Sequence, residues 1–366
     1  MWSPHGHNLA WVRDNDLFVT LEGKKEIRIT NDGSKNIING LADWVYEEEV
    51  LAEPTATWFS IDGKSVAFVK FDDTLVKDYE LQYYAKYGEN QYPTTIDVKY
   101  PKPGTPNPIV TLHIASLSAD GQSMPQVVID FGKNDFEPSD KLFTQVTWID
   151  SNSLFVRMMN RVQDRQKLFL VSRSSDFSSW SVEMVRDEVT PDEGWFPKLQ
   201  PLRVTHFKKN NVPATPSYIE LMDINDDGFM HMAYFEDIRA KKPTRWITNG
   251  HFEVTSIKGI NEDDGVIYYL STENGSTERH VYSIHLDGTN KKLLLGSAER
   301  PKPVIGQLPG SFGLRDTAGY YDAAFSPKCS YYVLGYLGPD IPWERIEKTG
   351  KDGTSLILVI KSLTLK

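Results

Sequence analysis

One phrase of two short apolar runs joined by a polar corner recurs along this chain and restricts its fold more than any other feature. The two clearest copies cover residues 2–12 and 58–69, and a looser copy covers residues 325–334. Partial copies cover residues 146–156 and 265–284, and a polar corner at residues 14–16 joins the apolar run 9–12 to a second apolar run at residues 17–19. The runs are rich in Val, Ile, Tyr, Phe and Trp, whereas the corners contain Asp, Asn, Gly and Ser, which is the composition of β-strands joined by tight turns. We therefore expect an all-β chain.

The spacing of these copies indicates a repeated unit. The phrase returns at intervals of roughly 40 to 55 residues, which is typical of the four-stranded blades of β-propellers. No segment shows sustained apolar periodicity of 3.6 residues, so a parallel α/β fold is disfavoured. The sequence thus predicts a β-propeller with four-stranded blades.

Composition excludes several classes of protein. The 366 residues are 40% hydrophobic, which is ordinary for a globular protein with a large core. The formal net charge is -10 and no Lys/Arg cluster is present, so we expect no nucleic-acid partner and favour a cationic or neutral one. Cys329 is the single cysteine, so no disulfide can form within the chain. No run approaches the roughly 20 apolar residues that span a bilayer.

The sequence contains no known catalytic or metal-binding motif. Residues 223–228 match the first half of a calcium-binding loop, but Tyr234 stands where such a loop needs glutamate, so a tight turn is the better interpretation. The eight histidines form no H-E-x-x-H pair, and no cysteine accompanies them at zinc spacing. No G-x-S-x-G nucleophile motif, Walker motif or dinucleotide fingerprint is present. We expect no catalytic residues in this chain, no metal and no cofactor.

Residues 43–50 form an acidic motif in which Glu47, Glu48 and Glu49 are crowded between apolar positions. Adjacent like charges resist joint ionisation, so a site that keeps two of them charged favours a cation, and a primary ammonium fits that description. On a helical turn neighbours diverge by only about 100°, so Glu48 and Glu49 can both reach one ligand, and we predict a short helix here. From the residues alone, a solvated face is the commoner interpretation of three consecutive glutamates.

Residues 78–108 depart from the blade pattern and are polar and rich in tyrosine and proline. Proline at this density prevents central-strand pairing, so we expect an extended excursion from a blade, which we call the arm. A solvated loop without partners is the alternative.

Several motifs, taken in chain order, are similar to those of one enzyme family. The most specific are the acidic motif and the Tyr-Pro pairs at Tyr92 and Tyr100. The other matching positions are Trp58, Ser60, Gly63, Ala67, Gln91, Val98, Lys102, Gly104, Asn107, Pro108, residues 146–148, Gly194, Trp195, Ile247, Thr248, Gly250 and residues 338–342. On these residues, which span nearly the whole chain, the sequence resembles the N-terminal propeller portion of the dipeptidyl peptidase IV family, prolyl oligopeptidase-like serine peptidases that include the fungal-type dipeptidyl aminopeptidases.

The resemblance implies a role for the acidic motif. In that family an eight-bladed propeller caps an α/β-hydrolase domain, and the last two glutamates of the motif bind the free amino terminus of the peptide. Carried over, the substrate-binding residues are Glu48 and Glu49. The family releases N-terminal dipeptides of the Xaa-Pro type by attack of a serine that histidine and aspartate activate.

The sequence departs from the family pattern in four respects. It contains neither the α/β-hydrolase domain with its serine, aspartate and histidine nor the early-blade arginine that contacts substrate. Near Gly194, where some members carry pocket-lining Phe and Arg, it offers Leu199 and Gln200. About six blades are represented rather than eight, so residues 1–366 are expected to form a partial ring whose terminal sheet edges are unpaired.

We therefore expect the substrate-gating, amino-terminus-binding part of a serine dipeptidyl aminopeptidase, inactive as a peptidase by itself. Its expected partners are a peptide with a free N-terminus, the missing α/β-hydrolase domain, and a second copy bound through the arm at residues 78–108. The family suggests a single-pass membrane-anchored protein of the secretory or vacuolar pathway, or a secreted one. Two rival hypotheses are a non-catalytic propeller that acts as a protein interaction module, and an unrelated scaffold propeller whose glutamates form only a solvated turn.

Overall fold

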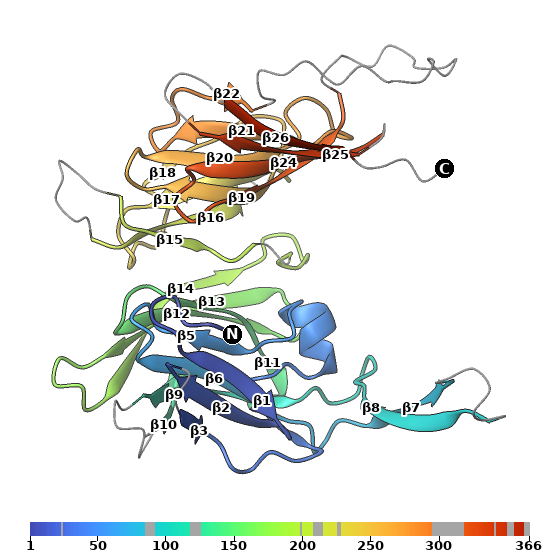
Figure 1. The fold of residues 1–366 in the computed structure, drawn as a ribbon. Coiled ribbons are helices and arrows are strands. Elements are labelled where there is room, and N and C mark those ends of the chain that lie inside the picture. The colour runs from blue at the N-terminus through green and yellow to red at the C-terminus, as the bar shows by residue number, and fades with distance from the viewer. Residues whose placement is uncertain are drawn as a thin grey trace. The chain divides into compact units, whose positions relative to one another are not determined.

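The computed structural model contains two compact units, Met1–Lys198 and Leu199–Lys366, and both are built almost wholly of antiparallel strands (Figure 1). The structure describes residues 1–22, 25–84, 92–117, 126–197, 200–207, 215–224, 228–294, 318–339, 342–349 and 355–361, with only the backbone of 25 and 355–361. Of the positions singled out in the sequence, those outside this part are Gln91, Leu199, residues 225–227, Asp340 and Ile341.

The first sheet of unit 1 contains a predicted polar corner. It pairs β1 (Leu9–Arg13), β2 (Asp16–Leu21) and β3 (Lys25–Arg28) in that order. Asp14 and Asn15 join β1 to β2 with φ angles of 52° and 62°. Positive φ at both central residues is the turn geometry that matches the twist of paired strands, and Asp and Asn tolerate it better than most residues. The prediction of a hairpin here is confirmed.

The second sheet is interrupted at its first strand position by the acidic motif. β4 (Ile37–Asn39) and β5 (Thr57–Phe59) both pair with β6 (Ser65–Asp72), β4 near its C-terminal end and β5 near its N-terminal end. β9 (Ile109–Ser116) pairs with the other side of β6 and also with β10 (Gln126–Val128). The two fragments β4 and β5 thus occupy one strand position, and the chain between them leaves the sheet to form the acidic motif.

The arm is inserted between β6 and β9. Asp72 pairs with Ile109, so the chain leaves and re-enters the sheet at one point. Within the insertion, β7 (Asp78–Tyr83) and β8 (Thr94–Lys99) form a separate two-stranded sheet, which Figure 1 shows as a hairpin extending away from β6 and β9. All six residues of β7 are exposed. For its described residues, the predicted excursion from a blade is confirmed.

The remaining sheets are four-stranded meanders, which is the pattern of propeller blades. Unit 1 ends with the sheet β11 (Lys141–Trp148), β12 (Ser153–Asn160), β13 (Arg165–Arg173) and β14 (Trp180–Val189). Unit 2 holds three such sheets: β15 (Arg203–Thr205), β16 (Ser217–Asp223), β17 (Met230–Phe235) and β18 (Arg245–Trp246); β19 (Val254–Asn261), β20 (Val266–Ser271), β21 (His280–His285) and β22 (Lys292–Leu293); and β23 (Tyr320–Phe325), β24 (Tyr331–Gly338), β25 (Trp343–Lys348) and β26 (Ser355–Lys361). The prediction of four-stranded blades is confirmed.

The core of unit 1 lies between its sheets. Seven of the eight residues of β12 are buried, because neighbouring side chains cover both faces of this central strand. One apolar cluster joins Tyr46 of the acidic motif to Phe71 of β6, Phe143 of β11 and Phe169 of β13. The acidic motif is therefore fixed by the same core that holds the second and third sheets.

Helical structure in the described part of the chain is limited to short turns. They are η1 (Tyr46–Val50), η2 (Gly132–Asn134) and η3 (Pro138–Asp140). Residues 44 and 45, which directly precede η1, are α-helical. None of these helices is long and apolar enough to cross a membrane. The prediction of an all-β chain rather than a parallel α/β fold is thus confirmed.

Candidate functional site

The acidic motif forms the predicted short helix, but most of it is wound as a π-helix. Residues 44–50 are helical, and η1 covers Tyr46–Val50. The N–H of Leu51 donates to the carbonyl oxygen of Tyr46 at 2.8 Å, which is the i→i+5 bond of this wider winding. A wider turn separates successive side chains by less than the roughly 100° of an α-helix, so neighbouring glutamates point in more similar directions.

Asp43 begins the helix. Its carboxylate accepts hydrogen bonds from the N–H groups of Val45 at 3.3 Å and Tyr46 at 3.2 Å, and its carbonyl accepts from the N–H of Glu47 at 2.8 Å. Aspartate is favoured at helix starts because it satisfies N–H groups that have no partner inside the helix. After the helix, Ala52 adopts a φ of 53°, which turns the chain back toward β5.

The buried face of the helix is anchored by Tyr46 and Val50. These residues lie four positions apart and are 0% and 6% exposed. The Tyr46 ring meets the Phe71 ring edge-on at a centroid distance of 4.8 Å. Its hydroxyl accepts a hydrogen bond from the backbone N–H of Phe143 at 3.1 Å. A five-residue helix has little stability of its own, so these contacts with two sheets hold it in place.

The outer face of the helix consists of three carboxylates. Because Tyr46 and Val50 face the core, Glu47, Glu48 and Glu49 must all point outward, and all three are exposed. No basic residue lies in the last turn of the helix, and no ion pair or hydrogen bond to these three side chains is present in the part of the chain that the structure describes. Glu48 and Glu49, the predicted site residues, therefore lie together on a helix that is fixed to the core, and neither has a charged partner among the described residues.

Two carboxyl groups are buried beside the acidic helix, that of Asp43 within the motif and that of Asp73 outside it. Asp43 is 2% exposed, and burial raises its pKa to about 6 although the N–H groups of Tyr46 and Val45 favour its charged form. Asp73 follows β6 and is 0% exposed. Burial, and then the neighbouring Asp43, raise the pKa of Asp73 to about 7, while Lys99 opposes this. Neither carboxylate oxygen of Asp73 has a hydrogen-bond partner among the described residues.

An aromatic contact joins the helix to the arm. The Trp44 ring lies against the ring of Tyr100, at a centroid distance of 4.2 Å. Tyr100 follows β8 at the base of the arm, and its own neighbour is Tyr79 of β7 at 5.5 Å. Sequence reasoning missed both this contact and the buried Asp73. The one feature of the sequence that points to the contact is that Trp44 and Tyr100 each belong to a motif shared with the dipeptidyl peptidase IV family.

Gln200, one of the positions at which the sequence departs from the family pattern, binds the backbone of unit 2. Its side-chain amide donates to the carbonyl oxygen of Ile257 at 2.9 Å and accepts from the N–H of the same residue at 2.7 Å. Both ends of the amide are therefore used to bind the backbone of β19.

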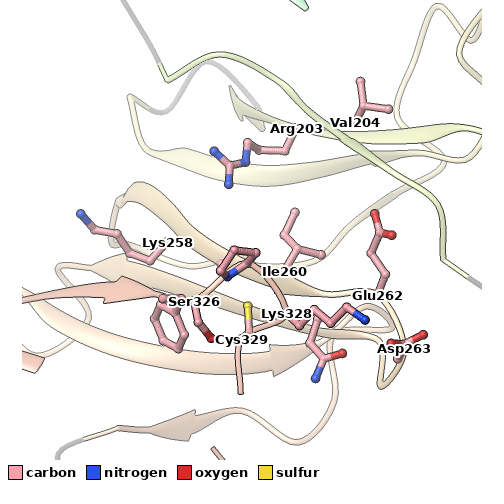
Figure 2. A pocket seen from close by; sticks show the side chains of 13 residues that line it. Arg203, Val204, Lys258, Ile260, Glu262, Asp263, Ser326, Lys328 and Cys329 are labelled. Carbon is pink, nitrogen blue, oxygen red and sulfur yellow. The ribbon is translucent and has the colours of Figure 1, made fainter. Parts of the chain in front are cut away.

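A separate cavity of about 410 Å³ lies within unit 2 (Figure 2). It is lined by β15, β19, the turn after β19, and the turn between β23 and β24. Several of its polar groups already have partners: Lys258 forms an ion pair with Asp322 at 2.6 Å, and Glu262 accepts from the N–H of His206 at 2.8 Å. Cys329 is buried in its wall, and burial raises the pKa of this thiol. Neither predicted site residue lines this cavity.

No group of three His, Cys, Asp or Glu side chains within the described ranges could hold a metal ion. The acidic helix is the candidate site, because its three outward carboxylates can receive a cationic ligand directly.

Comparison with known proteins shows which family this chain belongs to. Residues 1–343 match the family described as the dipeptidyl peptidase IV (DPP IV) N-terminal region. The chain belongs to this family. The probable dipeptidyl-aminopeptidase B of Aspergillus oryzae is 33% identical over 371 residues, which cover 96% of this chain and 37% of that protein. The protein of the same name from Phaeosphaeria nodorum is 34% identical over 368 residues, 95% of this chain and 36% of that protein.

Solved structures show the same fold. The crystal structure of Porphyromonas gingivalis dipeptidyl peptidase 4 matches with a TM-score of 0.71 and 24% identity, over 95% of this chain and 43% of that one. A putative dipeptidyl aminopeptidase IV from Bacteroides ovatus matches with a TM-score of 0.66 and 17% identity, over 94% of this chain and 44% of that one. The chain thus corresponds to the N-terminal DPP IV propeller region and spans little more than a third of the dipeptidyl-aminopeptidase B relatives.

Proposed function

We propose that this chain is the substrate-gating, amino-terminus-binding part of a serine dipeptidyl aminopeptidase that releases N-terminal Xaa-Pro-type dipeptides. Glu48 and Glu49 bind the free ammonium of the peptide. The observation that carries the proposal is a pair of carboxylates without a charged partner in the described part of the chain, on a helix fixed to the core by Tyr46. Membership in the DPP IV N-terminal family supports it.

The charge arrangement suits a primary ammonium. An ammonium has three N–H donors in compact form, and each carboxylate is an acceptor with two oxygens. Hydrogen bonds between charged partners are about twice as strong as those between neutral ones. An N-acylated peptide offers a neutral amide with a single donor, so the site discriminates between free and blocked amino termini.

Anchoring the ammonium also sets the position of cleavage. When the first residue is held by Glu48 and Glu49, the scissile bond lies at a fixed distance along the extended peptide, about 3.3 to 3.6 Å per residue. A catalytic serine at one fixed distance then releases a product of constant length. That serine, with its histidine and aspartate, belongs to the α/β-hydrolase domain expected from the family, so this chain alone is expected to show no peptidase turnover.

The test is a calorimetric titration of the chain with two matched ligands, Ile-Pro amide and its N-acetyl counterpart. We expect saturable binding of the free amine and none of the acetylated peptide at the same concentrations. Equal binding of both, or binding of neither, contradicts the proposal. Hydrolysis of an Xaa-Pro chromogenic substrate by the purified chain contradicts the expectation of inactivity.

A second candidate function is that of a non-catalytic protein interaction module, and the arm favours it. Tyr79, Leu81 and Tyr83 alternate along β7, so they lie on one face of the hairpin. Their cross-strand partners on β8 include Val98 and Ile96, opposite Tyr79 and Leu81. Tyr79, Leu81, Tyr83 and Ile96 are 42% to 53% exposed. A second copy of the chain, presenting the same apolar face, is the partner we propose for the arm.

A further inference from the structure

The stem at the base of the arm is closed by contacts between its two sides. The N–H of Tyr100 donates to the carbonyl oxygen of Lys77 at 3.0 Å, which closes the hairpin stem. The Lys99 ammonium donates to the carbonyl oxygen of Val76 at 2.8 Å and lies 3.5 Å from the Asp78 carboxylate. Tyr100 is therefore not a free side chain on a loop but part of an ordered stem.

The stem presents a layered set of rings to the helix. Trp44 contacts Tyr100 at 4.2 Å, Tyr100 contacts Tyr79 at 5.5 Å, and the Lys102 ammonium lies 4.8 Å from the centre of the Tyr79 ring. Trp44 and Tyr100 are both half-buried. Aromatic pairs at such distances stabilise beyond the area that they bury, and the cation adds to this at a partly dry site.

The remaining contacts that hold the acidic helix lie on the face opposite Trp44. Tyr46 and Val50 hold the core side, and Asp43 caps the first turn. Trp44 lies in the first helical turn and contacts the arm rather than the core cluster. The helix is thus held between the core on one side and the arm stem on the other, and the stem contact limits its rotation.

We propose that Trp44 and Tyr100 are positioning residues for the ammonium site: their contact fixes the helix so that Glu48 and Glu49 converge on one ligand. The inference rests on the proposed function of those glutamates. It assigns the arm stem a role in substrate affinity, distinct from any role of the exposed arm face in pairing with a second copy.

The test compares Tyr100→Ala with Tyr100→Phe in the whole chain, with Tyr83→Ala as a matched control on the same hairpin. The first readout is hydrogen exchange of the backbone amides of residues 46–50, and the second is the dissociation constant for Ile-Pro amide. We expect Tyr100→Ala to speed exchange and to weaken binding about threefold to tenfold, since a single aromatic contact is lost. Tyr100→Phe keeps the ring and is expected to restore both values, and Tyr83→Ala to change neither.

The outcomes separate this inference from the proposed function. Unchanged exchange in Tyr100→Ala overturns the inference, and so does faster exchange with unchanged affinity, because the contact then does not position the site. Loss of folding in Tyr100→Ala is detected by circular dichroism, and Trp44→Phe against Trp44→Leu then repeats the test from the other ring. If the wild-type chain does not prefer the free amine over the acetylated peptide, the proposed function fails, whatever the exchange rates show.

Discussion

The hydroxyl of Tyr46 accepts a hydrogen bond from the backbone N–H of Phe143 across 97 residues of sequence. Tyr46 comes from the acidic motif and Phe143 from β11, the first strand of the next sheet. This contact places the acidic helix at the junction of two sheets, and the burial of Tyr46 raises the pKa of its hydroxyl, so it stays protonated. The position of Glu48 and Glu49 therefore depends on how the second and third sheets pack.

Removing that hydroxyl is expected to destabilise the chain. Tyr46→Phe leaves the buried N–H of Phe143 without an acceptor, which costs about 1 to 3 kcal/mol of the free energy of unfolding. Urea denaturation followed by tryptophan fluorescence measures the loss. Tyr92→Phe is the control because Tyr92 is 81% exposed. Equal stability of Tyr46→Phe and the wild type contradicts the proposed anchor.

The buried carboxyl of Asp73 predicts a dependence of stability on pH. Its pKa is about 7 in the folded chain and about 4 when unfolded, so the folded state binds the proton more tightly. Stability is therefore lost as the pH rises from about 4 through 7, because the folded chain must then hold a buried charge. Asp73→Asn removes this loss, and its advantage in the free energy of unfolding is expected to grow by about 2 to 4 kcal/mol between pH 4 and pH 8.

Denaturation of Asp73→Asn and the wild type at several pH values measures whether the stability advantage of the variant grows as the pH rises. Glu80→Gln is the control, since Glu80 is an exposed carboxyl on β7 that does not act on Asp73. An advantage of Asp73→Asn that is constant with pH, or that shrinks as the pH rises, shows that the Asp73 carboxyl does not titrate as described.

The apolar face of the arm predicts self-association. Leu81 and Ile96 are cross-strand partners and are 46% and 44% exposed. Exposed apolar faces of this kind mark contact surfaces. The double variant Leu81→Ser/Ile96→Ser is expected to shift a dimer toward monomer in sedimentation velocity, with little effect on folding. Leu75→Ser, at a position 63% exposed outside the two strands, is the control. A monomeric wild-type chain contradicts the proposed pairing.

Local patterns in the sequence were sufficient to predict the strands, the corners and the short helix, because each of these depends on residues that are close together in the chain. The Asp14-Asn15 corner and the exposed Glu48 are examples. What could not be predicted depends on residues far apart in the chain. The split of one strand position into β4 and β5, the burial of Asp73, and the Trp44–Tyr100 contact all arise from packing between segments.

The measurement that most directly tests the central claim is the affinity of the chain for Ile-Pro amide in three single variants, Glu47→Gln, Glu48→Gln and Glu49→Gln. Glutamine keeps the size of each side chain and removes only its charge. We predict that Glu48→Gln and Glu49→Gln each weaken binding about tenfold or more, the value of a charge-assisted hydrogen bond, and that Glu47→Gln stays within about twofold of the wild type. Equal affinity in all four proteins, or equal weakening in all three variants, contradicts the account, because the glutamates then act only as a solvated or diffusely charged surface.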